Sequence, residues 1–427
     1  KPDRRQRQMC IRDSHFASQV QPESAFTVLA VAKELMAAGK QVYELEIGDS
    51  PFCSPPQAVE AAVQAIESGQ TRYGPSVGLD DFRASAADYV NREFGIEVTP
   101  DHLIAGHGAK IFEQLFCETF VNPGESVLVF SPHFPTYPAN IERRGGRVCL
   151  QPLEERHAFR PQLDSIKEFL DREECPRAVF LNSPHNPTGG VTTLEDLQGI
   201  ARLLEGTEVS VFSDEPYDQM VWSGRHHTML EVPGMIDRTV AAYSFSKSFS
   251  MSGWRLGFAV SSPAIVARMG MLMNTSLSCV PPFIQEAGVA AMKESILLRD
   301  QQMATFRENV THLVQSLRRV EGVDCSMPGG SFYAFPNVSQ ICRKNNITSH
   351  GLAMYLLEGA DDQRGVACLG GECFGDAGQG FLRLSCAESR ESLGDAVAFI
   401  DEAFGQCEKI ATYLDQNPNY RMAESMF

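Results

Sequence analysis

Short runs of apolar, often β-branched residues alternate with amphipathic stretches through the middle of the chain. The stretch 194–204 repeats apolar residues at helical spacing, and two further helical patterns flank a Gly/Pro-rich turn within 57–94. Strands and helices that take turns predict an α/β fold with βαβ units and a mostly parallel sheet, covered by helices on both faces. The runs expected to be strands are 126–131, 147–153, 178–183, 208–213, 239–244 and 256–260.

After residue 261 the pattern becomes helical, with a long run at 299–320 and strand signals at 331–336 and 381–386. This change predicts a second, smaller α+β domain, joined by the N-terminal segment. A chain of 427 residues is also too long for one ordinary core. The expected division is 1–14 as a non-native or disordered start, 15–54 as a segment of the small domain, 55–300 as the large domain, 301–406 as the small domain and 407–427 as a tail without an assigned role.

The composition narrows the class of protein. The 54 acidic and 37 basic residues give a net charge of −17, which argues against a nucleic-acid or membrane-surface binder because such partners need a basic face. The 12 cysteines are irregularly spaced without a C-x-x-C pair, so we expect reduced thiols in a cytoplasmic protein and no metal site. The Arg-rich start lacks the apolar core of a secretory signal; a tag or cloning sequence fits it at least as well as a transit peptide.

The segment 244–257, SFSKSFSMSGWRLG, carries the strongest chemical signal. It follows a predicted strand, so Lys247 would lie at the strand's carboxyl end, where open α/β sheets bind their ligands. A buried lysine can act as a Schiff-base nucleophile. Ser244 and Arg255 bracket it with a hydroxyl and a guanidinium suited to a phosphate. A solvated lysine in a Ser-rich loop is the alternative, but it leaves the following Gly-Trp-Arg-Leu-Gly unexplained.

This segment resembles the lysine signature of class I aminotransferases, the aspartate-aminotransferase-like branch of fold type I pyridoxal-phosphate enzymes. The resemblance extends over roughly residues 25–404. It implies that Lys247 holds pyridoxal 5'-phosphate as a Schiff base. The expected activity is then the transfer of the α-amino group of an amino acid to a 2-oxo acid by a ping-pong mechanism, in which the freed Lys247 amine moves the Cα proton.

Further motifs in the same order imply contacts with the cofactor ring. Asn186, in NSPHNPTGG at 182–190, and Tyr217 match residues that hydrogen-bond the phenolic oxygen. Asp214, in VFSDEPY at 211–217, matches the carboxylate that keeps the pyridine nitrogen protonated and the ring an electron sink. Phe134 matches the stacking aromatic. Taken alone, these motifs indicate no more than a turn, a strand-end cap and core packing. The implied catalytic residues are Lys247, Asp214 and Tyr217.

Two segments are assigned to the cofactor phosphate. The sequence AGHGAK at 105–110 precedes a helical run, and the free N–H groups of a helix start suit an anion. The resemblance implies that the main chain of Gly108, Ala109 and Lys110 cradles the phosphate. It also implies that Tyr73 reaches the phosphate bound in the partner subunit of a homodimer; a surface Tyr without a ligand is the alternative.

Substrate binding is expected from Arg383, which interrupts the apolar strand pattern FLRLS. Such a burial is costly unless a fixed anion faces the guanidinium, although a structural ion pair would also satisfy it. The resemblance implies a bidentate grip on the substrate α-carboxylate, completed by the Gly48 amide and Asn186. Phe332 and Tyr333 are expected to be packing residues. Ser50 stands where the family usually has Pro, so the resemblance does not identify the side chain of the substrate.

Two alternatives remain at this stage. A β-eliminating C–S lyase uses the same fold and nearly the same residues. A regulatory protein with an aminotransferase-like ligand domain would need a DNA-binding module, and only a short Arg-rich stretch precedes the enzyme-like part.

Overall fold

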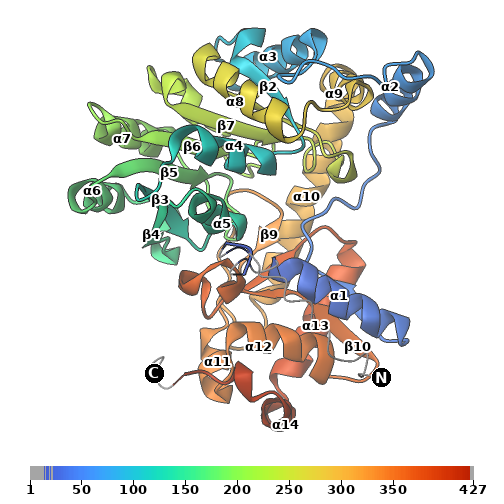
Figure 1. Ribbon diagram of the computed structural model, residues 1–427. Coiled ribbons are helices and arrows are strands. Elements are labelled where there is room, and N and C mark those ends of the chain that lie inside the picture. The colour runs from blue at the N-terminus through green and yellow to red at the C-terminus, as the bar shows by residue number, and fades with distance from the viewer. Residues whose placement is uncertain (1–13, 15, 19, 21–22, 424–427) are drawn as a thin grey trace, which may run out of the picture.

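The structure is a computed structural model that describes residues 14, 16–18, 20 and 23–423. Two lobes lie one above the other in Figure 1, with the main sheet in the upper lobe. The expected non-native or disordered start, 1–14, lies outside the described residues apart from Ser14. Within the described part of the chain, none of the helices combines the length and apolar character that a membrane span requires.

A seven-stranded sheet with the order β2-β8-β7-β6-β5-β3-β4 forms the upper lobe. The predicted mostly parallel sheet is confirmed: β8 runs opposite to the other six strands. The segment 245–256 returns to the sheet without a crossover helix, so β8 must run against β7. The strands are β2 (Leu103–Gly106), β3 (Ser126–Ser131), β4 (Arg147–Pro152), β5 (Pro176–Asn182), β6 (Ser210–Asp214), β7 (Thr239–Ser244) and β8 (Gly257–Val260).

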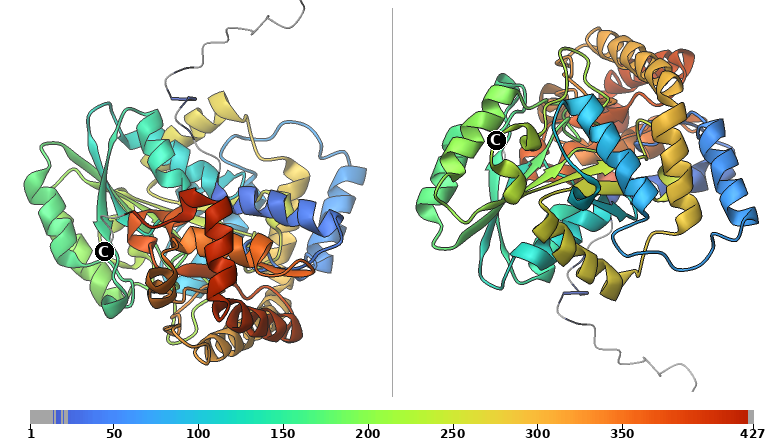
Figure 2. Two further views of the ribbon diagram at one scale, coloured as in Figure 1. Left: turned by 90° about the horizontal axis from the view of Figure 1, so that it is seen from below. Right: turned by 90° about the horizontal axis from the view of Figure 1, so that it is seen from above.

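Helices cover both faces of this sheet, as Figure 2 shows. Successive side chains of a strand point to opposite faces. Val127 and Val129 accordingly pack with α4, α5 and α8, whereas Leu128 and Phe130 pack with α6 and α7. The upper-lobe helices are α2 (Pro56–Glu67), α3 (Asp80–Phe94), α4 (Lys110–Phe120), α5 (Thr136–Arg143), α6 (Leu163–Arg172), α7 (Leu194–Leu204), α8 (Pro263–Ser276) and α9 (Pro282–Glu294).

The lower lobe combines both ends of the chain. Val28 and Ala32 of α1 and Leu45 are buried in the same hydrophobic cluster as the C-terminal helices, and β1 pairs in parallel with β10. The strands β11, β12 and β9 form a small antiparallel sheet. The elements are α1 (Ser24–Ala37), β1 (Gln41–Glu44), α10 (Ile296–Leu317), β9 (Tyr333–Ala334), α11 (Ser339–Asn345), α12 (Ser349–Met354), β10 (Arg364–Ala367), β11 (Leu369–Gly370), β12 (Leu382–Ser385), α13 (Arg390–Phe404) and α14 (Cys407–Gln416).

The tail without an assigned role contributes α14 to the lower lobe. Ile410, Tyr413 and Leu414 are buried in its hydrophobic cluster, and the Tyr413 hydroxyl donates to Glu358 Oε2 at 2.8 Å. We infer that this segment stabilises the lower lobe through buried apolar surface.

The carboxyl ends of the central parallel strands bring polar residues to one edge of the sheet. Asn182 at the end of β5 is in register with Asp214 at the end of β6, and Ser244 ends the adjacent β7. This edge faces the lower lobe (Figure 1). Open α/β sheets bind ligands at this edge, so it positions the site.

Candidate active site

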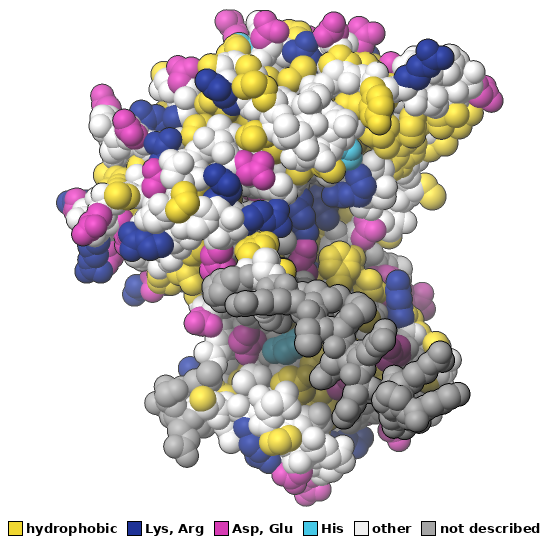
Figure 3. Space-filling model, viewed as in Figure 1, with side chains coloured by type: hydrophobic (Ala, Val, Ile, Leu, Met, Phe, Trp, Pro, Cys, Tyr) yellow, Lys and Arg dark blue, Asp and Glu magenta, His cyan; other side chains and the backbone are white. Residues whose placement is uncertain are grey.

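A cavity of about 500 Å³ lies at this edge, with walls from both lobes. Lys and Arg side chains gather on the surface where the lobes meet (Figure 3). Two predicted site residues are outside the lining: Gly108, which adjoins the Arg255 side chain, and Tyr73, which is 90% exposed. The predicted site residues that line the cavity are Gly48, Ala109, Lys110, Phe134, Asn186, Asp214, Tyr217, Ser244, Lys247, Arg255 and Arg383.

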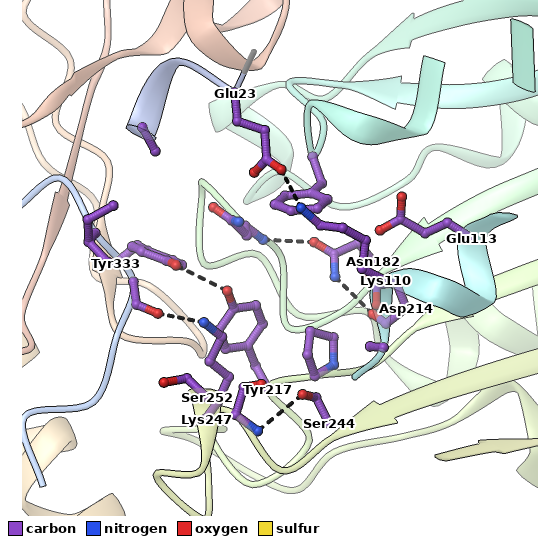
Figure 4. A pocket seen from close by; sticks show the side chains of 18 of the residues that line it. Glu23, Lys110, Glu113, Asn182, Asp214, Tyr217, Ser244, Lys247, Ser252 and Tyr333 are labelled. Carbon is purple, nitrogen blue, oxygen red and sulfur yellow. Dashed lines mark hydrogen bonds and ion pairs between the residues drawn. The ribbon is translucent and has the colours of Figure 1, made fainter. Parts of the chain in front are cut away.

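Lys247 lies in the loop that follows β7, and its side chain enters the cavity (Figure 4). The amine donates a hydrogen bond to the carbonyl of Gly48, which comes from the lower lobe. It lies 5.8 Å from the ring centroid of Tyr217 and 5.7 Å from that of Phe332. The acceptor of this hydrogen bond is a neutral main-chain carbonyl and not a carboxylate.

Asp214 is a buried carboxylate at the end of β6. The Tyr137 hydroxyl donates to its Oδ2 at 2.5 Å, and Asn182 Nδ2 donates to its main-chain oxygen at 2.8 Å. Burial raises the pKa of Asp214 to about 7, and the Tyr137 hydrogen bond only partly offsets this rise. A buried carboxylate of this kind favours a cationic partner, which fits a protonated pyridine nitrogen.

The start of α4 forms a cradle that fits a phosphate. Gly108 has a φ of +78°, and a Cβ there would lie 2.6 Å from Arg255 Nη2, so only glycine allows the guanidinium this close. Ala109 and Lys110 follow with the free N–H groups of a helix start. Ser244 lies on the same side of the cavity, where its Oγ accepts from Ser246 N at 3.1 Å. The donor set matches the phosphate of the expected cofactor.

Arg383 is a buried cation, only 4% exposed, that lies between the rings of Tyr333 at 4.3 Å and Phe374 at 4.9 Å. Nη1 donates to Asn186 Oδ1 at 3.0 Å, Nη2 donates to the Glu46 carbonyl, and Nε has no partner among the described residues. Its hydrogen-bond acceptors are therefore neutral oxygens and not the carboxylate of a structural ion pair. The site is suited to an anion brought by a ligand.

The structure adds lining residues that the sequence did not reveal. Tyr333, expected only to pack, also has its hydroxyl 3.1 Å from the Tyr217 hydroxyl. Glu23 forms an ion pair with Lys110, which lies 5.0 Å above the Phe134 ring (Figure 4). Glu113 is buried beside the cavity. No local motif marks these residues, because each reaches the cavity through a tertiary contact.

The family model described as aminotransferase class I and II matches residues 40–400. The chain belongs to this family. It is 30% identical over 367 residues to an aspartate aminotransferase of Pyrococcus horikoshii, covering 85% of this chain and 91% of that protein. A probable aspartate/prephenate aminotransferase of Aquifex aeolicus is 32% identical over 393 residues, covering 90% of this chain and 97% of that protein.

The solved structures agree with this aminotransferase assignment. The aspartate aminotransferase of Thermus thermophilus with maleate superimposes with a TM-score of 0.85 at 28% identity, over 92% of this chain and 99% of that chain. The chain is therefore an aminotransferase of a pyridoxal-phosphate-dependent family, and the resemblance drawn from its motifs is confirmed.

Proposed function

We propose that this aminotransferase binds pyridoxal phosphate between its lobes and moves the α-amino group of an amino acid to a 2-oxo acid by a ping-pong mechanism. One observation carries the proposal: Lys247, Asp214 and Arg383 line the same cavity, although they come from three separate segments of the chain. When bound, the cofactor supplies an electron-poor ring that weakens the bonds at the substrate Cα.

Different residues around the cavity are assigned to different parts of the cofactor. The amine of Lys247 holds the aldehyde carbon, and Asp214 pairs with the ring nitrogen at the opposite end. Phe134 stacks on the ring, while Asn186 and Tyr217 donate to the phenolic oxygen. The phosphate would be held by the main chain of Gly108, Ala109 and Lys110, by the side chains of Ser244 and Arg255, and by Tyr73 of the partner subunit. Gly108 N already donates to Gly106 O at 2.9 Å, so the amides of Ala109 and Lys110 would be the main-chain donors.

Arg383 orients the substrate. Its guanidinium lines the cavity and would hold the α-carboxylate, together with the Gly48 amide and Asn186. Gly48 has no room for a side chain, because a Cβ would lie 1.8 Å from the Tyr333 hydroxyl. A fixed carboxylate would place Cα beside Lys247, whose amine would remove the Cα proton and deliver a proton to the former aldehyde carbon of the cofactor.

A panel of amino donors tests the reaction. The relatives include enzymes named for aspartate and for aromatic amino acids, so both classes of donor belong in the panel. With donor alone, we expect the cofactor absorbance to change to that of its amine form, with one equivalent of 2-oxo acid released. An added 2-oxo acid should restore the starting spectrum. Release of pyruvate and ammonia from a donor with a β-leaving group would instead indicate a lyase, and an unchanged spectrum with every donor would contradict the proposal.

A homodimer with shared sites is part of the proposal. Exposed apolar side chains lie along α2, at Val59, Val63 and Ile66, and the 90% exposed Tyr73 follows on the next loop. Figure 3 shows apolar atoms gathered on the α2 side of the molecule. Exposed apolar patches mark interaction surfaces, and a twofold contact there would bring Tyr73 toward the partner's cavity.

We also propose domain boundaries at 54/55, 300/301 and 406/407 and a cytoplasmic location. The packing of α1 with the C-terminal helices supports placing 15–54 with the small domain. The described cysteines are all free thiols, which supports a reducing compartment.

A further inference from the structure

Behind the substrate wall of the cavity lies a carboxyl group that the proposed reaction does not use. Glu46 is 0% exposed, and neither of its carboxyl oxygens has a hydrogen-bond partner among the described residues. It does not line the cavity, whereas Ile47 and Gly48 do. Burying a carboxyl group with both oxygens unpaired costs free energy, so we expect this group to have a function.

The backbone fixes Glu46 against the substrate-binding arginine. Leu45 N donates to Ala367 O at 2.9 Å, and Ser385 N donates to Leu45 O at 2.8 Å, so this segment is held between β10 and β12. The carbonyl of Glu46 itself accepts from Arg383 Nη2. The Glu46 carboxyl also interacts electrostatically with the Arg383 guanidinium, although it does not line the cavity.

We propose that Glu46 is a positioning residue whose proton sets how tightly Arg383 holds a substrate carboxylate. The inference rests on the proposed role of Arg383. With Glu46 protonated, the guanidinium faces the cavity as an uncompensated cation. With Glu46 ionised, the two charges offset each other and the attraction for an incoming carboxylate weakens.

The surrounding groups place this change near neutral pH. Burial is the main cause that raises the pKa of Glu46 to about 7. The proximity of its own backbone N–H is the largest opposing cause; Glu44 and Glu388 raise the pKa further, and Arg383 lowers it. The buried thiol of Cys368 is a further titratable neighbour, and Glu46 contributes to raising its pKa. A bound carboxylate adds negative charge and favours the protonated form, so binding takes up a proton at Glu46.

The test measures binding of a 2-oxo acid to holoenzyme carrying the amine form of the cofactor. Such an acid has no amine and stays fully ionised between about pH 6 and 8.5. The acid is the one among 2-oxoglutarate, oxaloacetate, pyruvate and phenylpyruvate that reacts best. Single-turnover absorbance measurements separate the Kd of this acid from the maximum rate. We expect the wild-type Kd to rise about tenfold over this range, the equivalent of one pKa unit. The Kd of Glu46→Gln should stay near the low-pH wild-type value, with a maximum rate close to that of wild type at each pH.

Matched variants make the outcome decisive. Glu388→Gln removes the neighbouring carboxyl and should keep the rise in Kd. Glu46→Asp keeps a titratable group and should show the rise with a lower midpoint, which provides a second readout if Glu46→Gln does not fold. A wild-type Kd that is constant across this pH range, or a Glu46→Gln protein that keeps the wild-type rise, would overturn the inference.

Arg383→Lys separates this inference from the function on which it rests. It should raise the Kd at every pH, in the wild-type and the Glu46→Gln backgrounds alike. An unchanged Kd in Arg383→Lys would place the carboxylate site elsewhere and refute the proposed substrate contact, whatever the pH dependence shows.

Discussion

At the scale of single residues, the site is built around carboxyl groups that burial keeps from ionising easily. The pKa values of Asp214 and Glu46 are raised to about 7 and that of Glu113 to about 8, in each case mainly by burial. Withdrawing a carboxylate from water costs free energy unless a cation or donors compensate. Such groups accumulate where a ligand supplies the compensation, so they mark this cavity as functional.

Glu113 gives a pH-dependent prediction for stability. Its Oε2 accepts from Thr136 Oγ1 at 2.6 Å and from Asn140 Nδ2 at 3.0 Å. Its pKa of about 8 compares with 4.5 for an ordinary glutamate, so between these values the folded protein binds more protons than the unfolded chain. The free energy of unfolding of cofactor-free protein should therefore fall as pH rises through this window, by on the order of 4 kcal/mol from this group.

Urea unfolding of cofactor-free protein at about pH 5 and pH 8 measures this effect. Glu113→Gln keeps an acceptor for both donors and should lose much less stability between the two pH values than wild type. Glu118→Gln, on the same helix, controls for the loss of one negative charge. An equal loss of stability in Glu113→Gln and wild type would show that Glu113 does not titrate in this window.

The sequence predicted the residues whose local surroundings are unusual. Asp214 lies at the end of an apolar strand, Lys247 lies three residues beyond one, and Arg383 interrupts one. Tyr137 and Tyr333 gave no such signal, since an aromatic residue in an amphipathic or apolar segment is equally typical of a core. Their hydroxyl contacts with Asp214 and Tyr217 depend on the packing of distant segments.

At the scale of elements, the start of α4 determines how the cofactor phosphate is held. The sharp turn at Gly108 delivers the first amides of the helix to the cavity and leaves space for the Arg255 guanidinium. A helix start with free N–H groups carries a partial positive charge, which adds to that of arginine. The element, rather than any single side chain, is therefore the expected anion site.

Gly108→Ala tests this arrangement. A Cβ at 2.6 Å from Arg255 Nη2, on a backbone with φ of +78°, should displace the guanidinium and weaken cofactor binding about tenfold or more. Equilibrium titration of cofactor-free protein with pyridoxal phosphate measures the Kd. Gly253→Ala provides the control, because a Cβ at Gly253 meets no atom within 4 Å. Equal affinities in the two variants would rule out the proposed cradle.

Elements with a long periodic pattern were predicted well, and short or edge elements were not. The strand at 126–131 and the helix at 194–204 have the bounds expected from their apolar spacing. The strand expected at 331–336 narrows to Tyr333–Ala334, since Pro336 has no N–H to donate to a ladder. β2 has only four residues and no distinctive pattern, and it lies at the sheet edge, where pairing with β8 defines it.

At the scale of the whole molecule, the cavity lies between two lobes, and in the proposed homodimer a second copy would complete the phosphate site. The 90% exposed Tyr73 cannot serve its own cavity, which it does not line. The exposed apolar side chains of α2 would provide the surface for the proposed contact. An intact site would then require two chains.

Hybrid dimers test this arrangement. Lys247→Ala and Tyr73→Ala proteins should each have low activity alone. After the two are mixed, unfolded and refolded together, half of the dimers contain one site with both native residues. Activity should therefore rise to about one quarter of wild type. Activity that stays at the average of the separate variants, with mixed dimers present by mass spectrometry, would place Tyr73 in the cavity of its own chain or outside the site.

The covalent attachment of the cofactor tests the central claim most directly. Holoenzyme treated with borohydride and digested should yield one modified peptide, from 244–257, with the reduced cofactor on Lys247 by mass spectrometry. The Lys247→Ala variant, which keeps Asp214 and Arg383, should yield no such peptide. A modification at another lysine, or a cofactor that dialyses away intact after reduction, would contradict the account.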